Sequence, residues 1–176
     1  VPIALTLFHL FEKKIIDIDA HISLSKFRVL DKGQRDSGVL KFLPQNTTVT
    51  LRFLCSIMLA LSDNAATNII LEFIKRRDIN NLMESMGFPH TKIIIDTIDP
   101  AKLETKKNSL GQTTPEEMSK LFMHLDEGSI ISSRNSQEIV TSLQFTQATT
   151  PSSNLLQTAK NVNDKHIQIK RVFGKG

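Results

Sequence analysis

The stretch TLRFLCSIMLALSDNAATN, residues 50–68, decides the fold of this chain. Its apolar residues recur at a spacing that places them on one face of a helix: Leu51, Leu54, Cys55, Met58 and Leu59. Thr50 is a favoured residue at the position before a helix, so the pattern predicts a helix that begins after Thr50. Ser62-Asp63-Asn64 ends this pattern, and a second helix is predicted from about Ala65 to Lys75.

The first residues of the chain predict another amphipathic helix. Its apolar residues recur at i, i+3, i+4 and i+7: Ala4, Leu7, Phe8 and Phe11. This helix should end near Lys13-Lys14. Residues 15–46 show no sustained period and contain Asp, Ser, Gly and Pro, so they predict a long connection.

Further helices and one strand are predicted downstream. The helices are expected over these stretches: Ile79 to Met86 with Gly87 as the stop, the capping box Thr114-Pro115-Glu116-Glu117 to just before Gly128, Ser132 or Ser133 to about Gln144, and one that Thr150-Pro151 opens. The residues from His166 to Phe173 are β-branched and partly alternating, which predicts a strand.

Composition limits the function classes. With 176 residues and 40% hydrophobic content, the chain fits one domain with a core. Its net charge of +4 is mildly basic, but the Lys and Arg residues are scattered and Trp and Tyr are absent, so no nucleic-acid binding is expected. The single cysteine, Cys55, excludes an internal disulfide and is predicted to lie in the core. No transmembrane segment and no signal peptide are recognised in the sequence.

Ser62-Asp63-Asn64 has two interpretations. Ser, Asp and Asn are favoured caps between two helices, which gives the tripeptide a purely structural explanation. The same tripeptide recurs at a helix end in penicillin-recognising serine enzymes, together with Ser-x-x-Lys, which carries the nucleophile, and Lys-Thr-Gly on a strand. A neutral hydroxyl accepts and donates a proton, and an amide both donates and accepts hydrogen bonds, so these residue types suit acyl-transfer chemistry.

Several stretches spread along almost the whole chain form one ordered set: Ser37-Gly38-Val39-Leu40, Thr50-Leu51-Arg52, residues 57–68, residues 86–91, residues 111–118 and Ile130-Ile131-Ser132. In this order they resemble the class A β-lactamases and their relatives, a family of active-site-serine hydrolases. The resemblance implies a mainly α chain from an α+β family fold, namely the helical domain of the serine β-lactamase and DD-peptidase-like fold. Residues 1–176 are then an incomplete domain, with the helical part over 1–160 and the start of one sheet strand over 164–176.

The resemblance also implies roles for single residues. Ser62 would help to pass a proton to the departing amide nitrogen, and Asn64 would hydrogen-bond the substrate and the catalytic lysine. Asp63 would point inward and support the turn. Lys175 resembles the lysine of Lys-Thr-Gly that binds the substrate carboxylate. Gly176 stands where Thr or Ser is expected, so a solvated lysine remains the alternative.

The only Ser-x-x-Lys in the chain is Ser23-Leu24-Ser25-Lys26, and we reject it as the nucleophile motif. Ser23 follows the first apolar helix instead of heading it, and it lies too close to Ser62 in the sequence for the family spacing. In the resemblance, residues 1–5 match the stretch that directly follows the catalytic lysine. Both the nucleophile and its activating base are therefore expected to be missing from these 176 residues.

The last feature to compare with the family is an acidic residue in the loop between Thr91 and Thr114. Class A β-lactamases carry a loop glutamate that activates the deacylating water and is usually followed by Leu-Asn. Between Thr91 and Thr114 the chain has Asp96, Asp99 and Glu104, but not that pattern. Asp99 and Glu104 are the candidate loop acids, and a solvated loop carboxylate is the alternative for each.

The resemblance implies a β-lactamase-like serine hydrolase, which transfers an acyl group from a β-lactam or peptide amide to serine and then to water. The chain as given is expected to be inactive, and the alternative is a non-catalytic helical binding or interaction module with the same fold. The expected partner is a small-molecule β-lactam or a cell-wall peptide. No cofactor is expected, and no metal site, because the five histidines show no paired ligand spacing. The resemblance implies a periplasmic or secreted protein.

Overall fold

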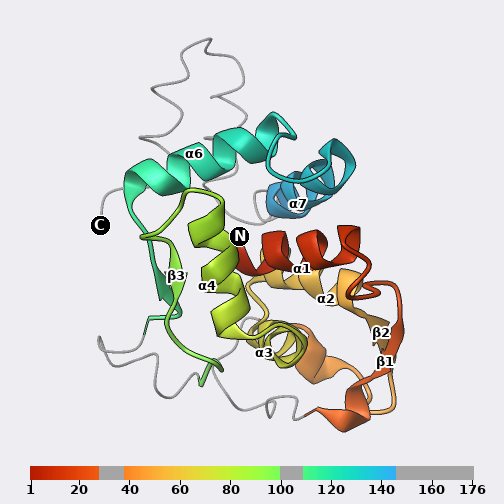
Figure 1. The fold of residues 1–176 in the computed structure, drawn as a ribbon. Coiled ribbons are helices and arrows are strands. Elements are labelled where there is room, and N and C mark those ends of the chain that lie inside the picture. Colours follow the sequence, from red (N-terminus) through yellow and green to blue (C-terminus); the bar gives the residue numbers. More distant parts are fainter. Residues whose placement is uncertain (28–37, 100–108, 146–176) are drawn as a thin grey trace.

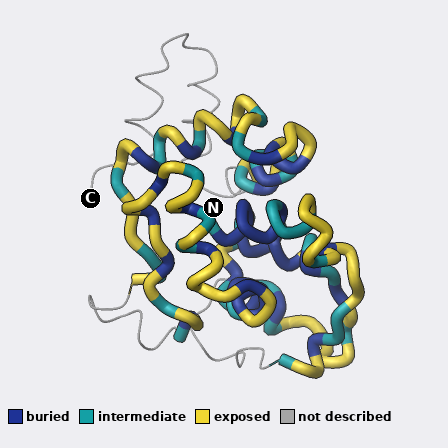
Figure 2. Tube along the Cα trace, viewed as in Figure 1, coloured by how far each residue is buried: buried dark blue, intermediate teal, exposed yellow. Residues whose placement is uncertain are grey.

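The apolar stretch after Thr50 forms helix α2, Leu51–Leu61, which lies beside helix α1, Pro2–Glu12 (Figure 1). The computed structural model describes residues 1–27, 38–99 and 109–145. Thr50 caps α2 as predicted, because its Oγ1 accepts a hydrogen bond from the Phe53 amide at 3.1 Å. Figure 2 shows α1 and α2 as the buried centre of the described residues.

The remaining helices surround this centre. They are α3, Asn64–Phe73; α4, Arg76–Ser85; α6, Pro115–Asp126; and α7, Ser133–Phe145. Helix α2 packs against α3 and α7, α1 packs against α4 and α7, and α6 packs against α7 (Figure 1). This arrangement confirms the predicted mainly helical fold class. No helix within the described ranges is both long and apolar enough to cross a membrane.

The predicted helix limits are close to the observed ones, with two differences. Gly87 and Gly128 end α4 and α6 as predicted, and both have positive φ, of 89° and 65°. Helix α3 ends at Phe73, two residues before the predicted Lys75. Helix α4 begins at Arg76 instead of Ile79, because its first turn is polar and carries no apolar residue that would mark its start.

Two pairs of short strands were not predicted. Strand β1, His21–Ser23, pairs antiparallel with β2, Thr48–Thr50, and β3, Lys92–Ile93, pairs antiparallel with β4, Gly111–Gln112. Strands of two or three residues are too short to show an alternating pattern in the sequence. The predicted connection over 15–46 therefore contains β1 and two 3₁₀ turns, Leu24–Lys26 and Leu40–Phe42. The helix opened by Thr150 and the strand over 166–173 lie outside the described residues.

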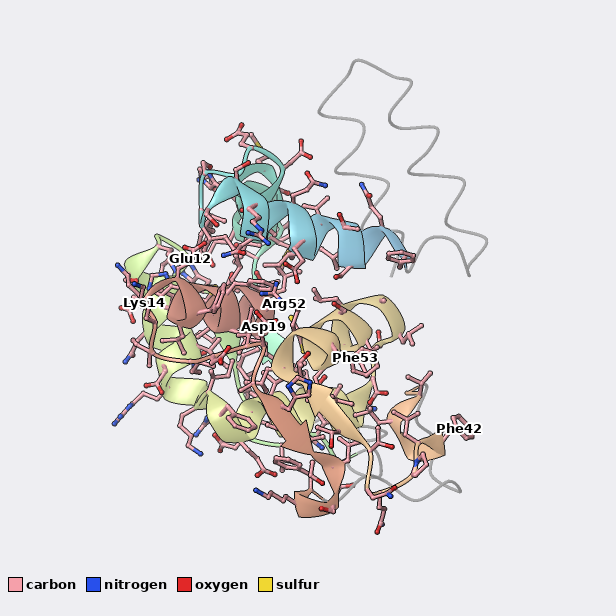
Figure 3. The ribbon with its side chains drawn as sticks, turned by 90° about the vertical axis from the view of Figure 1, so that its right-hand side faces the viewer. Glu12, Lys14, Asp19, Phe42, Arg52 and Phe53 are labelled. Atoms are coloured by element: carbon pink, nitrogen blue, oxygen red, sulfur yellow. The ribbon has the colours of Figure 1, made fainter. Side chains whose placement is uncertain are left out.

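Arg52 joins three of the helices (Figure 3). Its guanidinium donates two hydrogen bonds to the Asp19 carboxylate, at 2.6 Å and 2.9 Å, and a third to Glu138 of α7. The same group lies 5.8 Å and 5.5 Å from the ring centres of Phe8 and Phe11 on α1. Arg52 therefore connects α2 to α1, to α7 and to the loop that follows α1.

Cys55 lies in the core, which confirms its predicted position. Its side chain faces the centre of the described fold, and the residue is 1% exposed. Burial raises the pKa of the Cys55 thiol to about 12. The thiol is therefore protonated near neutral pH, as expected for a cysteine in an apolar core.

Candidate active site

The Ser62-Asp63-Asn64 turn joins α2 to α3 with an unusual backbone. Ser62 has φ 53° and ψ 40°, the left-handed conformation, and Asp63 returns to an extended conformation before α3 begins at Asn64. Among the described residues other than glycine, only Lys14 and Ser62 have positive φ. Strained backbone of this kind concentrates at functional sites, which makes the turn a candidate site.

Asp63 holds the turn in place from inside. The residue is fully buried, and its Oδ1 accepts a hydrogen bond from the Ala66 amide at 2.9 Å, which caps α3. Its Oδ2 accepts hydrogen bonds from the amides of Val39 and Leu40 at 2.7 Å and 3.0 Å. One carboxylate thus fixes the start of α3 and the segment at residues 38–40 to each other.

Gly38 allows this close approach. A Cβ atom at Gly38 would lie 2.4–2.6 Å from the carboxyl atoms of Asp63, a distance that no side chain tolerates. This contact explains why a glycine in the 37–40 stretch and an aspartate in the tripeptide occur together in the sequence. The two residues lie 25 positions apart in the sequence, so no local pattern links them.

Ser62 and Asn64 flank the buried aspartate. Ser62 is exposed and Asn64 is partly exposed, whereas Asp63 between them has no exposed surface. The turn therefore presents a hydroxyl and an amide at the surface, two residues apart, and the buried Asp63 between them holds the backbone in place. Such a pair can exchange a proton and form hydrogen bonds with a bound molecule.

Asn68, one helical turn after Asn64, is a site residue to which sequence analysis gave no role. Its side-chain amide accepts a hydrogen bond from Ile98 N at 2.6 Å and donates one to Ile98 O at 2.9 Å. The amide thus binds both backbone groups of one loop residue. The spacing of four residues between Asn64 and Asn68 was the available signal, because residues i and i+4 share a helix face.

Residues 93–98, which lead from β3 into the loop, are held to α3 and α4 by side chains. Asn80 binds both the N–H and the carbonyl of Ile93, at 2.8 Å and 3.0 Å. Arg76 donates to the Ile94 carbonyl at 2.7 Å and pairs with Asp96 at 2.9 Å. Figure 1 shows this segment passing along α4 toward α3. The Asp96 carboxylate therefore forms an ion pair with Arg76.

The base of this loop is fastened to α6 by Glu117. Thr114 caps α6 as predicted, since its Oγ1 accepts from the Glu117 amide at 3.2 Å. The Glu117 side chain does not complete a capping box. It accepts hydrogen bonds from the His90 amide at 3.0 Å and from the Thr91 hydroxyl at 2.6 Å, and it contacts His90 Nδ1 at 2.8 Å. Burial raises the pKa of Glu117, but these hydrogen bonds lower it more, so that its pKa lies below the ordinary value.

The other predicted site residues are separate from this turn or outside the described part. Ser23 ends β1, and its hydroxyl contacts that of Ser25 at 2.8 Å and accepts from the Ser25 amide at 3.4 Å. Asp99 follows Ile98 directly and is partly exposed. Glu104 and Lys175 lie outside the described residues. Within residues 1–27, 38–99 and 109–145, no three potential metal ligands come together.

Known proteins share both this sequence pattern and this fold. The model of the β-lactamase enzyme family matches residues 1–172 of the chain. Among curated proteins, no sequence matches the chain significantly.

Several solved structures have the same fold. They include the β-lactamase from Sphaerobacter thermophilus (TM-score 0.70, 18% identity), PBP-A (0.67, 19%) and a class A β-lactamase from Bacteroides cellulosilyticus (0.66, 19%). Each match covers 86% of this chain and 53%, 52% and 53% of the respective structure. A variant of PBP-A was solved as an acyl-enzyme complex with penicillin G. The chain spans about half the length of these structures. With the family model matched along nearly its whole length, the chain belongs to the β-lactamase enzyme family.

Proposed function

We propose that the protein is a serine hydrolase that transfers the acyl group of a β-lactam or a cell-wall peptide to a serine and then to water. The observation that carries the proposal is the turn at residues 62–64. Its backbone is held by the buried Asp63 carboxylate, and the side chains of Ser62 and Asn64 remain at the surface on either side. Family membership is consistent with this chemistry.

In the acylation step, the nucleophilic serine Oγ bonds to the amide carbon, its proton passes to the activating base, and the C–N bond breaks. The departing nitrogen takes up a proton, and we assign the Ser62 hydroxyl to relay that proton from the base to the nitrogen. We assign Asn64 to hydrogen-bond the substrate amide, since its side chain both donates and accepts. Lys175 is proposed to bind the substrate carboxylate. The resemblance further suggests a site of action in the periplasm or outside the cell.

We also propose that Ser23 is not the nucleophile and that the 176 residues alone do not form an acyl-enzyme. The Ser23 hydroxyl is paired with Ser25 and caps a 3₁₀ turn of three residues. A nucleophile serine needs a base within hydrogen-bond reach. Ser23 is the last residue of a short strand and does not begin a helix, so no helical turn brings the Lys26 side chain next to its hydroxyl.

A reporter penicillin tests this proposal. The 176-residue chain, and any longer protein of which it is a part (the full-length protein), are each incubated with the reporter, and their masses are measured. We expect a covalent adduct on the full-length protein and none on the chain. An adduct on Ser23 would refute our rejection of that residue. The absence of any adduct on the full-length protein would favour a non-catalytic module with the same fold.

Variants test the role of the turn. With the full-length protein, Ser62→Ala should slow acylation about 100-fold, the lower range for a positioned proton-transfer group. Ser85→Ala is the matched control, because Ser85 is exposed at the end of α4 and its hydroxyl donates to the Leu82 carbonyl of the same helix. Equal acylation rates for the two variants would show that the Ser62 hydroxyl does not deliver the proton.

A further inference from the structure

The turn that follows residues 38–40 carries large apolar side chains into solvent. Phe42 and Leu43 are 64% and 37% exposed, and Pro44 after them is exposed as well. Large apolar residues scattered singly over a surface are ordinary, but these three are consecutive. We call residues 42–44 the apolar tip. Figure 3 shows Phe42 at the edge of the described fold, with its ring directed away from the helices.

The backbone that carries the apolar tip is fixed by the residues just before it. Leu40 is fully buried. The Asp63 carboxylate accepts hydrogen bonds from the amides of Val39 and Leu40 at 2.7 Å and 3.0 Å. The Phe42 amide donates to the Val39 carbonyl at 3.0 Å. The Leu43 amide donates to the Leu40 carbonyl at the same distance, which closes the 3₁₀ turn. The fold therefore holds these apolar side chains outward.

The charge beside the apolar tip is positive. Lys41 precedes the tip, and its Nζ lies 5.3 Å from the centre of the Phe42 ring. The other charged residue between positions 38 and 53 is Arg52, which binds Asp19 and Glu138, and this stretch contains no acidic residue. Exposed amide and hydroxyl side chains follow the tip: Gln45, Asn46 and Thr48. The segment thus combines an apolar end with a cation and uncharged polar residues.

This combination suits the interface of an anionic bilayer. Apolar side chains on a projecting turn can enter the boundary between lipid headgroups and acyl chains. A lysine next to them attracts the lipid phosphates while its stem lies on apolar surface, and an acidic residue at that place would be repelled. A bilayer is fluid and closes around a convex tip, whereas a protein partner needs a pocket of matching shape. The observations therefore favour lipid as the occupant.

We propose that the apolar tip is a membrane contact: Phe42 and Leu43 insert into the interface of a bilayer that contains anionic lipids, and Lys41 contacts the lipid phosphates. Two inserted side chains give weak and reversible binding. Since the Asp63 carboxylate binds the backbone just before the tip, the same contact holds the turn at residues 62–64 near the membrane surface. The inference goes beyond the proposed function and does not depend on acyl transfer.

Vesicle binding tests this contact. The full-length protein is mixed with vesicles of phosphatidylglycerol and phosphatidylcholine in equal parts, and the bound fraction is measured by sedimentation. We expect binding, and Phe42→Ser should weaken it about 10-fold, because one large apolar side chain no longer enters the bilayer. Ile15→Ser is the matched control. Ile15 is 68% exposed, and its neighbour Lys14 lies at the opposite edge in Figure 3, so this variant should bind like the wild type.

The charge of Lys41 is tested with the same vesicles. Lys41→Gln should weaken binding about 5-fold, since a lysine near an anionic surface contributes modestly to the attraction. Added salt should weaken the binding of the wild type more than that of Lys41→Gln, because salt screens the charge that the variant lacks. Unchanged binding by Lys41→Gln would refute the assignment of an anionic lipid.

Tryptophan fluorescence gives a second measurement at the tip itself. These 176 residues contain no Trp. The fluorescence that Phe42→Trp adds to the wild-type spectrum should shift to shorter wavelength when vesicles are added, because the ring leaves water for the interface. The fluorescence that Ile15→Trp adds should not shift. Phe42→Trp keeps a large aromatic side chain, so it decides the question even if Phe42→Ser does not fold.

The inference is wrong if the wild type does not bind the anionic vesicles, if a folded Phe42→Ser binds them as well as the wild type, or if vesicles leave the Phe42→Trp spectrum unshifted. A tip that docks into another protein predicts the first and the third of these results. Penicillin labelling is measured separately. Failure of the membrane contact therefore leaves the proposed function in place, and failure of labelling leaves the membrane contact in place.

Discussion

Ser62 combines backbone strain with a proposed chemical role. An L-residue in the left-handed conformation costs about 1–2 kcal/mol that glycine avoids. The fold maintains this conformation because the following residue, Asp63, is anchored by three hydrogen bonds that its carboxylate accepts from backbone amides. A serine at a position that favours glycine is consistent with a requirement for its hydroxyl.

This strain predicts a difference between two variants of Ser62. Ser62→Gly and Ser62→Ala both remove the hydroxyl, but only alanine keeps the Cβ atom that opposes φ 53°. We expect the free energy of unfolding of Ser62→Gly to exceed that of Ser62→Ala by about 1 kcal/mol. Urea unfolding followed by circular dichroism measures it. Equal stabilities would show that the turn relaxes when the hydroxyl is lost.

The sequence indicated the tripeptide but not what surrounds it. Ser62, Asp63 and Asn64 are contiguous, so their spacing along the chain is sufficient to recognise them. The contact of Asp63 with Val39 spans 24 positions, and that of Asn68 with Ile98 spans 30. Contacts at such separations depend on how α2, α3 and the loop after β3 pack, and no local pattern encodes them.

At the scale of elements, the segment that follows β3 is ordered by side chains from its neighbours. Beyond the pairing of β3 with β4, the backbone groups of Ile93 and Ile98 bind the amides of Asn80 and Asn68. Glu117 of α6 fixes the residues just before β3. The position of this loop therefore depends on three separate helices.

Glu117 should make the stability of the protein depend on pH. Its pKa in the folded state lies below the ordinary value of 4.5, so the stabilisation from its carboxylate is complete above pH 4.5 and is lost as the pH falls through the lowered value. We expect Glu117→Gln to be less stable than the wild type at pH 7, and the difference to shrink below pH 4.5.

Urea midpoints measured from pH 7 to pH 3 provide the test. Thr91→Val serves as the control, because it keeps the carboxylate but removes the 2.6 Å hydrogen bond that lowers its pKa. That variant should begin to lose stability at a higher pH than the wild type. A difference between Glu117→Gln and the wild type that stays constant over the whole range would contradict the assignment.

At the scale of the whole molecule, Arg52 connects elements that are distant in the sequence. It binds Asp19 and Glu138, which lie 33 and 86 positions away, and covers two aromatic rings of α1 (Figure 3). The Arg52 side chain is 28% exposed, so water screens these contacts only partly.

Replacing Arg52 should therefore destabilise the protein more than breaking a surface pair. We expect Arg52→Ala to lower the free energy of unfolding by about 2 kcal/mol, since two carboxylates lose a charged donor and two rings lose a cation. Lys120→Ala breaks the exposed i,i+4 pair with Glu116 and should cost about 0.5 kcal/mol or less. Urea unfolding at pH 7 compares the two, and equal losses would show that Arg52 adds nothing beyond a surface contact.

Within the described residues, the sequence alone predicted where the helices lie, and it also indicated the family and the residues of the turn. Apolar residues at helical spacing and caps such as Thr50 and Thr114 act within one or two helical turns, so they can be recognised without a structure. Only the tertiary structure decided which side chains hold the site together. The links from Asp63 to residues 38–40, from Asn68 to Ile98 and from Glu117 to Thr91 each join segments that meet only when the helices pack, because a hydrogen bond depends on distance in space and not on distance along the chain.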